Sequence, residues 1–161
     1  MQQKLPPRRE CIRLFLKGLS GLEKPLKTAM YTYVQATGQM LDATGKVIAV
    51  GYSGLGIAKN DPDAQHVPNI GPIPVGKYTI MPPINSPSHG PYAMHLEPYA
   101  ENDMEGRGAF MLHGDNTTHT ASEGCIILPR GTRETIWGSG DHQLEVIAQL
   151  VEVGDEGPAS D

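Results

Sequence analysis

Long apolar runs and cysteines are both scarce in this sequence of 161 residues. No apolar stretch approaches the roughly 18 residues that a membrane-spanning helix needs. The two cysteines, Cys11 and Cys125, allow at most one bridge, so a disulfide framework is excluded and a structural bond between them is not expected. The chain is long enough for one domain with one core and too short for two ordinary domains.

Basic side chains are scarce outside the first segment. Residues 1–29 carry seven basic and two acidic side chains, whereas the remaining residues carry six basic and 16 acidic ones. The body of the chain is therefore acidic, with a net charge of −10, and offers no surface that could neutralise phosphates. This distribution of charge argues against nucleic-acid binding as the main activity.

The basic first segment lacks the pattern of a secretory signal. Its apolar stretch, CIRLFLKGL, is interrupted by Arg13 and Lys17, and no small-x-small cleavage site follows closely. We expect residues 1–29 to be an extension that is disordered or not native, with a short amphipathic helix at a membrane surface as the alternative. Met30 is an alternative to Met1 as the native start.

The 19 glycines and 14 prolines favour many short strands and tight turns over long helices. The alternation of apolar and polar residues in 31–54 predicts a three-stranded meander with turns at Thr37-Gly38 and Thr44-Gly45. Further strands are expected at 76–81, around 92–98, up to His113, across 124–128 and across 142–153, with a helical turn or two at 132–137 capped by Thr132.

The predicted fold is therefore mainly β, a sandwich or half-open barrel with one or two short helices. It occupies residues 30–153, and a polar tail follows at 154–161. Apart from the strand around 92–98, residues 82–109 are expected to be loop. Residues 86–108 are either a flap that packs Tyr92 and Tyr99 on a ligand or a plain connection.

Cys125 and His113 are the candidate catalytic residues. A thiol attacks as thiolate, so a catalytic cysteine needs a neighbour that takes its proton. His113 ends an apolar strand, and Cys125 begins the next strand after a polar loop, so the two side chains meet if those strands are neighbours. The alternative is a small buried cysteine beside an incidental histidine. The combination of a strand-end His-Gly with Ser-x-Gly-Cys favours the catalytic interpretation.

The residues around Cys125 suggest how its loop turns. A glycine at position 124 permits a sharp turn that a side chain would block, and the N–H groups of Gly124 and Cys125 can then face a developing oxyanion. Ser122 can hydrogen-bond within this turn. His119 is a second candidate for the base, and Asp115 could either orient an imidazole or form a turn.

Four blocks of the sequence, in this order, carry a family resemblance: YTYVQATGQM, GYSGLGIAKNDP, NIGPIPVGKYTI and ASEGCIILPRGTRE. Together with the His-Gly at 113–114, they resemble the L,D-transpeptidase (YkuD-like) catalytic domain. Within it they are most similar to small type VI secretion effectors, antibacterial toxins that act on peptidoglycan. The resemblance covers about residues 30–151 and implies an L,D-transpeptidase-type β fold with no cofactor.

The resemblance also implies a reaction and its residues. Cys125 matches the nucleophile of the family and His113 its general base, while Ser122 and Gly124 match its turn and oxyanion hole. The implied enzyme is an L,D-carboxypeptidase that cleaves the L,D bond before the terminal D-Ala of a tetrapeptide stem through a thioacyl-enzyme. A D-amino acid in place of water would give exchange.

This sequence departs from the wider family at two points. Ile127 stands where many cross-linking members carry Arg or Asn, and the spacing from His113 to Cys125 is short. Both features make housekeeping cross-linking, the first alternative function, less favoured than an effector role. The candidate substrate-binding residues are Arg130 and Arg133, which could hold a carboxylate, together with Lys59, Asn60, Tyr52 and His119.

The effector resemblance implies a location and partners. We expect the protein to be made in the cytoplasm and delivered by type VI secretion into the periplasm of a target cell. Peptidoglycan stem peptides are the expected substrate, and a cognate immunity protein and a secretion carrier or adaptor are the expected protein partners.

Two further functions stay open. A zinc-dependent cell-wall peptidase is conceivable because His113, His119 and Cys125, with Asp115 nearby, offer zinc ligands, although their spacing matches no common zinc pattern. A non-catalytic wall-binding module is the other alternative. GYSGLG lacks the features of a phosphate loop or a nucleophile elbow and is expected to be a turn. His89, His95 and His142 are expected to be structural or surface residues.

Overall fold

The computed structural model describes residues 29–151, and its chain begins with a meander. Strands β1 (Tyr31–Val34), β2 (Gln39–Leu41) and β3 (Val47–Val50) pair antiparallel in sequence order. Gly38 and Gly45 lie in the two turns with φ of 69° and 86°, a conformation that glycine adopts without steric cost. The meander predicted for this segment is confirmed. The expectations for the basic extension and for the polar tail at 154–161 lie outside the described residues.

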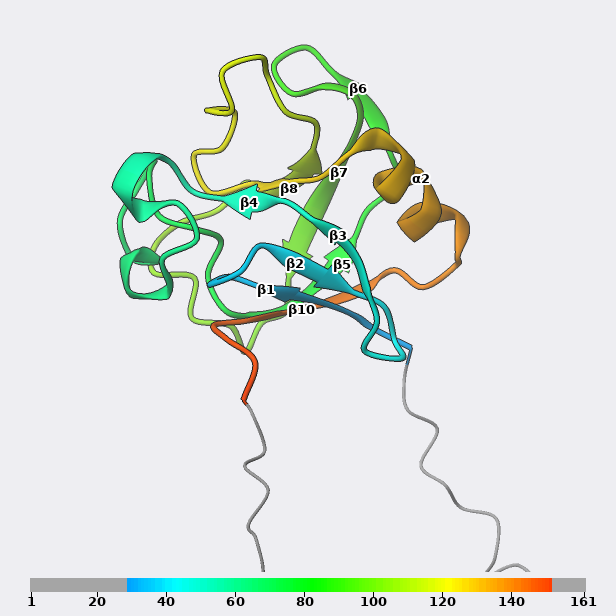
Figure 1. Cartoon of the computed structure of the whole chain (residues 1–161), viewed down its shortest axis with the longest axis horizontal. Helices are drawn as coiled ribbons and strands as arrows, with labels where there is room; N and C mark the ends of the chain where they lie inside the picture. The colour runs from blue at the N-terminus through cyan, green and yellow to red at the C-terminus, as the bar shows by residue number, and fades with distance from the viewer. Residues whose placement is uncertain (1–28, 152–161) are drawn as a thin grey trace, which may run out of the picture.

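A single curved mixed sheet contains all ten strands of residues 29–151 (Figure 1). The remaining strands are β4 (Tyr52–Ser53), β5 (Gly76–Ile80), β6 (Ile84–Ser86), β7 (Gly90–Pro98), β8 (Met111–His113), β9 (Ile126–Ile127) and β10 (Gln143–Ile147). Their order is β3-β2-β1-β10-β5-β7-β8-β9-β4, with β6 paired to β7 beside this path. The long strand β7 connects the two halves, because Leu96 to Pro98 pair with β5 while Met94 and His95 pair with β8.

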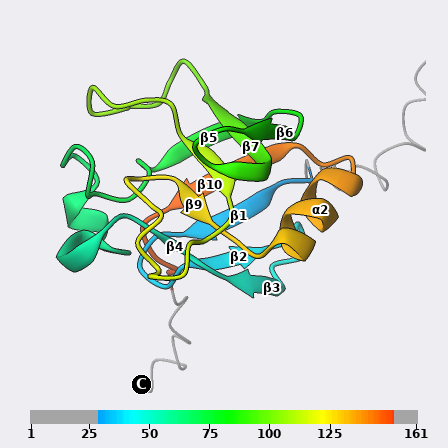
Figure 2. The same ribbon diagram turned by 90° about the horizontal axis from the view of Figure 1, so that it is seen from above.

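The sheet curls until its two ends nearly meet. Strands β3 and β4 stand at opposite ends of the strand order, yet only Gly51 separates them in the chain. A Cβ atom at Gly51 would lie 1.8 Å from the Ile127 carbonyl oxygen, so only glycine permits this close passage beside β9. The mainly β, half-open barrel predicted from the sequence is confirmed, and Figure 2 shows the strands wrapping around the interior.

One α-helix, α2 (Arg130–Gly138), and two single 3₁₀ turns, η1 (Gly56–Ala58) and η2 (Pro62–Ala64), complete the described elements. The predicted cap at Thr132 is wrong, because the helix begins two residues earlier. Pro129 precedes it with φ of −56°, and its carbonyl accepts the first helical hydrogen bond from the Arg133 N–H at 3.2 Å. Pro129 is thus the N-cap residue, with an extended ψ of 150°, and Thr132 lies inside the first turn.

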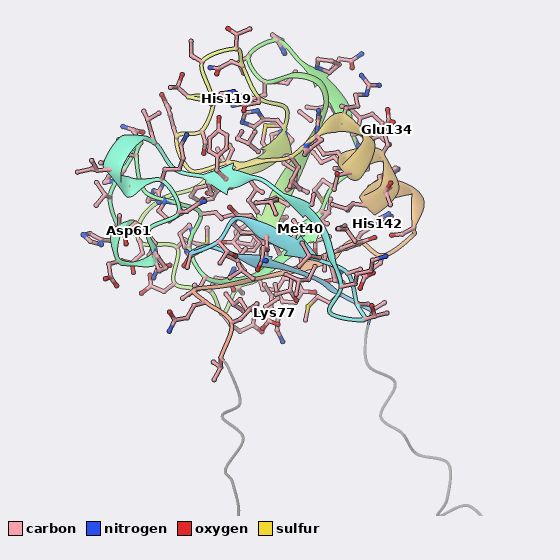
Figure 3. All side chains as sticks on the ribbon, in the orientation of Figure 1. Met40, Asp61, Lys77, His119, Glu134 and His142 are labelled. Atoms are coloured by element: carbon pink, nitrogen blue, oxygen red, sulfur yellow. The ribbon has the colours of Figure 1, made fainter. Side chains whose placement is uncertain are left out.

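The apolar core fills the space enclosed by the curled sheet and α2. Its fully buried side chains include Tyr33, Met40, Tyr78, Leu112 and Ile136, and Figure 3 marks Met40 in this interior. No helix within residues 29–151 is long and apolar enough to span a bilayer.

The strand expected around residues 92–98 is confirmed as β7 (Gly90–Pro98), whereas the short strand β6 was not predicted. Strand β7 lies in the middle of the sheet, and β6 pairs with it as a hairpin. The signal for β6 was weak, because Ile84–Ser86 contains one apolar residue among prolines and serines. Tyr99 donates a hydrogen bond to Gln143, and the two line a hollow other than the one that contains Cys125, so Tyr99 does not cover the thiol.

Candidate active site

His113 is held rigidly at the end of β8. Its side chain is only 3% exposed, and its Nδ1 lies 2.8 Å from the Gly114 carbonyl oxygen. Since a carbonyl can only accept, Nδ1 carries the proton of the neutral imidazole and Nε2 carries the lone pair. Nε2 is buried and has no hydrogen-bond partner among the described residues. The ring therefore presents an unoccupied base.

Cys125 lies beside this base because β8 and β9 are parallel neighbours. Leu112 pairs with Ile126 and His113 with Ile127, which brings the start of β9 against the end of β8. The Cys125 sulfur and a ring nitrogen of His113 belong to a group of atoms that all lie within 4.8 Å of one another. Cys125 is a free thiol, 8% exposed. The predicted adjacency of the two strands is thus present.

Ser122 organises the turn that leads to Cys125. Its buried hydroxyl donates to the Cys125 carbonyl at 2.6 Å and accepts from the N–H groups of Gly54 at 2.8 Å and Gly124 at 3.1 Å. The Gly124 N–H is therefore occupied. The expectation that it faces a developing oxyanion is wrong. The Cys125 N–H donates no hydrogen bond within residues 29–151, so it remains available for that role.

Gly124 is required by space as well as by its backbone angle. Its φ is 131°, and an added Cβ would lie 2.5 Å from Arg107 Nη2 and 2.7 Å from Phe110 Cε1. A side chain at this position would displace the loop that carries the thiol. The prediction that the turn before Cys125 needs a glycine is therefore explained by direct steric contact with Arg107 and Phe110.

Arg107 links this loop to the neighbouring one, and it was not predicted from the sequence. Its guanidinium donates to four backbone carbonyls: Gln65 at 2.6 Å, Pro72 at 2.7 Å, Gly71 at 2.9 Å and Glu123 at 3.1 Å. It also lies 5.1 Å from the centre of the Phe110 ring. Because every partner is a backbone carbonyl, no second conspicuous side chain in the sequence signals this arrangement.

The two catalytic candidates are both neutral in this environment. Burial raises the pKa of the Cys125 thiol to about 11, against smaller lowering effects from the Met111 N–H and the Arg107 charge. Burial lowers the pKa of His113, and the Gly114 hydrogen bond opposes this only in part. The resting pair is therefore thiol and imidazole, not thiolate and imidazolium.

His89 is a further residue of this site. It was expected to be structural or on the surface, but its ring lies edge-on to that of His113 with 4.7 Å between the ring centroids. One of its nitrogens also lies within 4.8 Å of the Cys125 sulfur. The hairpin of β6 and β7 brings it there from a Pro- and Ser-rich turn, and a lone histidine in such a turn gives no sequence signal.

Cys125 opens into a cleft of about 520 Å³. Its walls come from the β6–β7 turn, the loop before β8 and the loop that carries the thiol: Asn69, Ser88, His89, Gly108, Ala109, Phe110, Thr120, Ala121, Glu123 and Cys125. Figure 1 shows the β6–β7 turn and the loop after β8 at the same end of the molecule. Cys125 lines this cleft, and most of the other lining side chains are small or polar.

His119 lies outside the group around Cys125. Figure 3 places it on the outer loop after β8, where its Nδ1 pairs with Asp115 Oδ2 at 2.6 Å and its ring is exposed. Asp115 also accepts a hydrogen bond from the Tyr52 hydroxyl, and Lys59 Nζ donates to the His119 carbonyl at 2.7 Å. Asp115 does orient an imidazole, but that of His119.

The other expected substrate contacts are distributed around a second hollow. A second cavity, of about 430 Å³, lies beside Gly114 and is lined by Tyr52, Arg130 and Arg133. None of these three residues lines the cleft at Cys125. The buried Arg133 donates to the carbonyls of Leu128, Pro91 and Tyr92, so its guanidinium holds the structure together. Arg130 is half exposed and pairs with Glu134 at 2.8 Å.

Asn60 has a local structural function. Its backbone φ is 56°, and its side-chain oxygen accepts from the Ser53 N–H at 3.0 Å. His142 likewise stacks on Trp137, with 3.8 Å between ring centroids. His95 is exposed on β7. These placements agree with the structural and surface positions expected for His142 and His95.

The zinc ligands considered from the sequence do not come together as a set. Within the described part of the chain, the His and Cys side chains that could share a metal ion are His89, His113 and Cys125. His119, the third ligand that the sequence had offered, is instead paired with Asp115.

Comparisons with known proteins identify the family. No curated protein sequence matches the chain. The crystal structure of the helical cell shape determining protein Pgp2 from Campylobacter jejuni is similar, with a TM-score of 0.48 and 15% sequence identity over 86% of this chain and 56% of that one. The chain thus spans little more than half the length of that protein, and we draw no conclusion about function from a similarity this low. The Tlde1 domain matches residues 48–150, most of the chain, which therefore belongs to this family of type VI L,D-transpeptidase effectors.

Proposed function

We propose that the protein is an antibacterial type VI effector that acts on peptidoglycan tetrapeptide stems through Cys125. It removes the terminal D-Ala as an L,D-carboxypeptidase, and it exchanges D-Ala where another D-amino acid reaches the intermediate. Family membership supports the effector role and the peptidoglycan target. The single observation that carries the chemistry is the free Nε2 lone pair of buried His113 beside the Cys125 thiol.

Proton transfer comes first in this mechanism. Because the pKa of the Cys125 thiol is raised and that of His113 is lowered, the resting site holds a thiol and a neutral imidazole. His113 Nε2 takes the thiol proton as the sulfur attacks, so it acts as a general base in the attacking step. The Gly114 carbonyl fixes the tautomer that this step needs and stabilises the imidazolium that forms.

The sulfur attacks the carbonyl carbon of the L-centre of the third stem residue. The carbonyl oxygen becomes an oxyanion that the Cys125 N–H can stabilise. As the amide bond breaks, the imidazolium of His113 gives its proton to the departing amine of D-Ala, which leaves a thioester on Cys125. Water, deprotonated by His113, then hydrolyses the thioester and restores the thiol. A D-amino acid amine in place of water yields the exchange product.

The cleft beside Cys125 is the proposed position of the scissile bond. Thr120, Ala121 and Ser88 on its walls are small enough to admit an extended peptide. Arg130 in the neighbouring hollow remains our candidate for a substrate carboxylate, since its guanidinium is half exposed. Lys59 contacts both the Tyr52 ring and the His119 carbonyl, and these three residues remain candidates for contacts farther along the stem or glycan.

Delivery to the periplasm of a target cell and neutralisation by a cognate immunity protein complete the proposal. A protein that inserts into the cleft at Cys125 would exclude substrate from the thiol. A carrier or adaptor of the secretion system is the other proposed partner.

The decisive experiment is mass spectrometry of purified disaccharide-tetrapeptide incubated with the protein or with Cys125→Ala, each with and without D-Met. We expect loss of D-Ala, or its replacement by D-Met, with intact Cys125 only. Conversion by Cys125→Ala would refute the thioacyl route. An unchanged muropeptide in every tube would refute the proposed activity and favour a wall-binding module.

A further inference from the structure

His89, His113 and Cys125 supply three metal-ligating atoms from three different elements. They come from the β6–β7 turn, the end of β8 and the start of β9, and one ligand atom of each lies within 4.8 Å of the others. Tetrahedral zinc, with bonds of about 2.0–2.3 Å, separates its ligand atoms by about 3.5 Å. A contraction of up to about 1.3 Å at the widest pair is therefore enough to close the group around one ion.

Each imidazole already has a hydrogen-bond contact at its Nδ1, which leaves its Nε2 for a metal ion. Nδ1 of His113 donates to the Gly114 carbonyl at 2.8 Å, and Nδ1 of His89 lies 2.8 Å from the Ser88 hydroxyl. Such contacts fix the ring and direct the other nitrogen toward a metal. In His113, which is 3% exposed, this other nitrogen is buried and has no partner within residues 29–151.

We propose that these three side chains form a site for Zn²⁺ or a similar borderline-soft divalent cation, and that the bound ion reversibly switches off the thiol. The ion binds the Cys125 thiolate and Nε2 of His113, and the thiol proton is released to solvent. The fourth position of the ion faces the cleft beside Cys125. Nitrogen and thiolate donors together suit zinc better than magnesium or calcium.

The inhibitory consequence rests on the proposed function, whereas the binding does not. A bound ion occupies the nucleophile and the lone pair of the base together, so neither proton transfer nor attack can proceed. The proposed proton transfers involve Cys125 and His113, whereas His89 is proposed only as a ligand of the ion. Its position against both catalytic candidates thereby gains a chemical explanation.

Binding is tested with Co²⁺ as a spectroscopic probe on the reduced full-length protein. We expect one Co²⁺ per chain, with a thiolate-to-cobalt charge-transfer band and the visible bands of tetrahedral cobalt, both removed by added Zn²⁺. Cys125→Ser should abolish the charge-transfer band, and His89→Gln should weaken Co²⁺ binding by at least about tenfold. His95→Gln, an exposed histidine on β7, is the matched control and should leave the titration unchanged.

Several outcomes overturn the site: no band at millimolar Co²⁺, a band that survives Cys125→Ser, or an affinity that His89→Gln does not alter. Circular dichroism of each variant confirms that it is folded.

Activity on tetrapeptide separates the inhibitory consequence from the proposed function. We expect Zn²⁺ to stop D-Ala release and a chelator to restore it. For His89→Gln, inhibition measured relative to the metal-free rate of that same variant should need higher Zn²⁺. Activity that is lost with chelator and regained with Zn²⁺ would overturn inhibition and indicate a metallopeptidase. Cobalt binding without any D-Ala release would refute the proposed activity and leave the site intact. D-Ala release without cobalt binding would refute the site and leave the activity intact.

Discussion

The guanidinium of Arg107 donates a hydrogen bond to the carbonyl of Glu123 at 3.1 Å, two residues before Cys125. The same guanidinium holds the carbonyls of Gln65, Gly71 and Pro72. It therefore links the loop that carries the thiol to the loop between η2 and β5. Because the proposed mechanism needs the thiol to be positioned to within a fraction of an ångström of its base, we expect this link to affect activity.

Arg107→Ala should therefore reduce both stability and activity. Four carbonyls lose a charged donor, and we expect the free energy of unfolding to fall by about 2–3 kcal/mol. D-Ala release should fall further than the loss of folded protein explains, because the thiol loop is no longer fixed. Urea titration and kcat/KM measured well below the midpoint provide the comparison.

Arg107→Lys is the informative companion variant. It retains the charge but not the planar fork that reaches several carbonyls. If Lys restored both stability and kcat/KM, charge alone would explain the effect and the multiple hydrogen bonds would be irrelevant.

Gly124→Ala tests the steric requirement at the nucleophile turn. The new Cβ would meet Arg107 Nη2 at 2.5 Å and Phe110 Cε1 at 2.7 Å, at a φ of 131°. We expect a loss of about 3 kcal/mol or more in the free energy of unfolding, and no D-Ala release.

Gly131→Ala is the matched control for this change. Gly131 lies in α2 with nothing within 4 Å of an added Cβ, so alanine should stabilise the helix by about 0.5–1 kcal/mol. Equal stability of the two variants in thermal unfolding would contradict the steric explanation.

Much of this site follows from local sequence. The apolar strand before His113 and the strand after Cys125 were recognisable by composition, and their parallel pairing brings the two side chains together. The glycine before the cysteine was also recognisable, because a turn of this kind excludes a side chain. These features depend on short stretches whose local patterns agree with the tertiary structure.

His89 and Arg107 were not recognisable for a different reason. His89 depends on the register of the β6–β7 hairpin, and Arg107 binds carbonyls from segments distant in the sequence. Because every residue type has a backbone carbonyl, the identity of the partner residues does not indicate such a contact. The cap of α2 was misplaced because the proline at 129 determined the helix start rather than the hydroxyl of Thr132. Long-range placement and backbone partners thus account for the residues that were missed.

The Cys125 thiol should react slowly with alkylating agents in the absence of substrate. Burial raises its pKa to about 11 from an ordinary 9.0, so at neutral pH its thiolate fraction is lower by about 100-fold. The rate of carbamidomethylation should rise with pH until about 11, since a raised pKa delays formation of the thiolate.

Intact-mass kinetics at several pH values, with glutathione as the reference thiol, measure this rate. Cys125 must be followed by peptide mapping, because Cys11 also reacts. A rate at pH 7 equal to or above that of glutathione would indicate a preformed thiolate and contradict the neutral pair.

Two substitutions distinguish the candidate bases. His113→Gln removes the buried nitrogen beside the thiol, and D-Ala release should fall by roughly 10²–10⁴-fold in kcat. His119→Gln removes an exposed ring that pairs with Asp115 outside the group around Cys125, so its effect should be confined to KM and remain below about tenfold, as for a single exposed contact.

In the wild type, the acidic limb of kcat/KM against pH should have its midpoint below 6.5, because burial lowers the pKa of His113 and keeps the imidazole neutral to lower pH. The limb should keep this midpoint in His119→Gln. A larger loss of kcat in His119→Gln than in His113→Gln, or a midpoint that moves with His119, would transfer the role of base to His119.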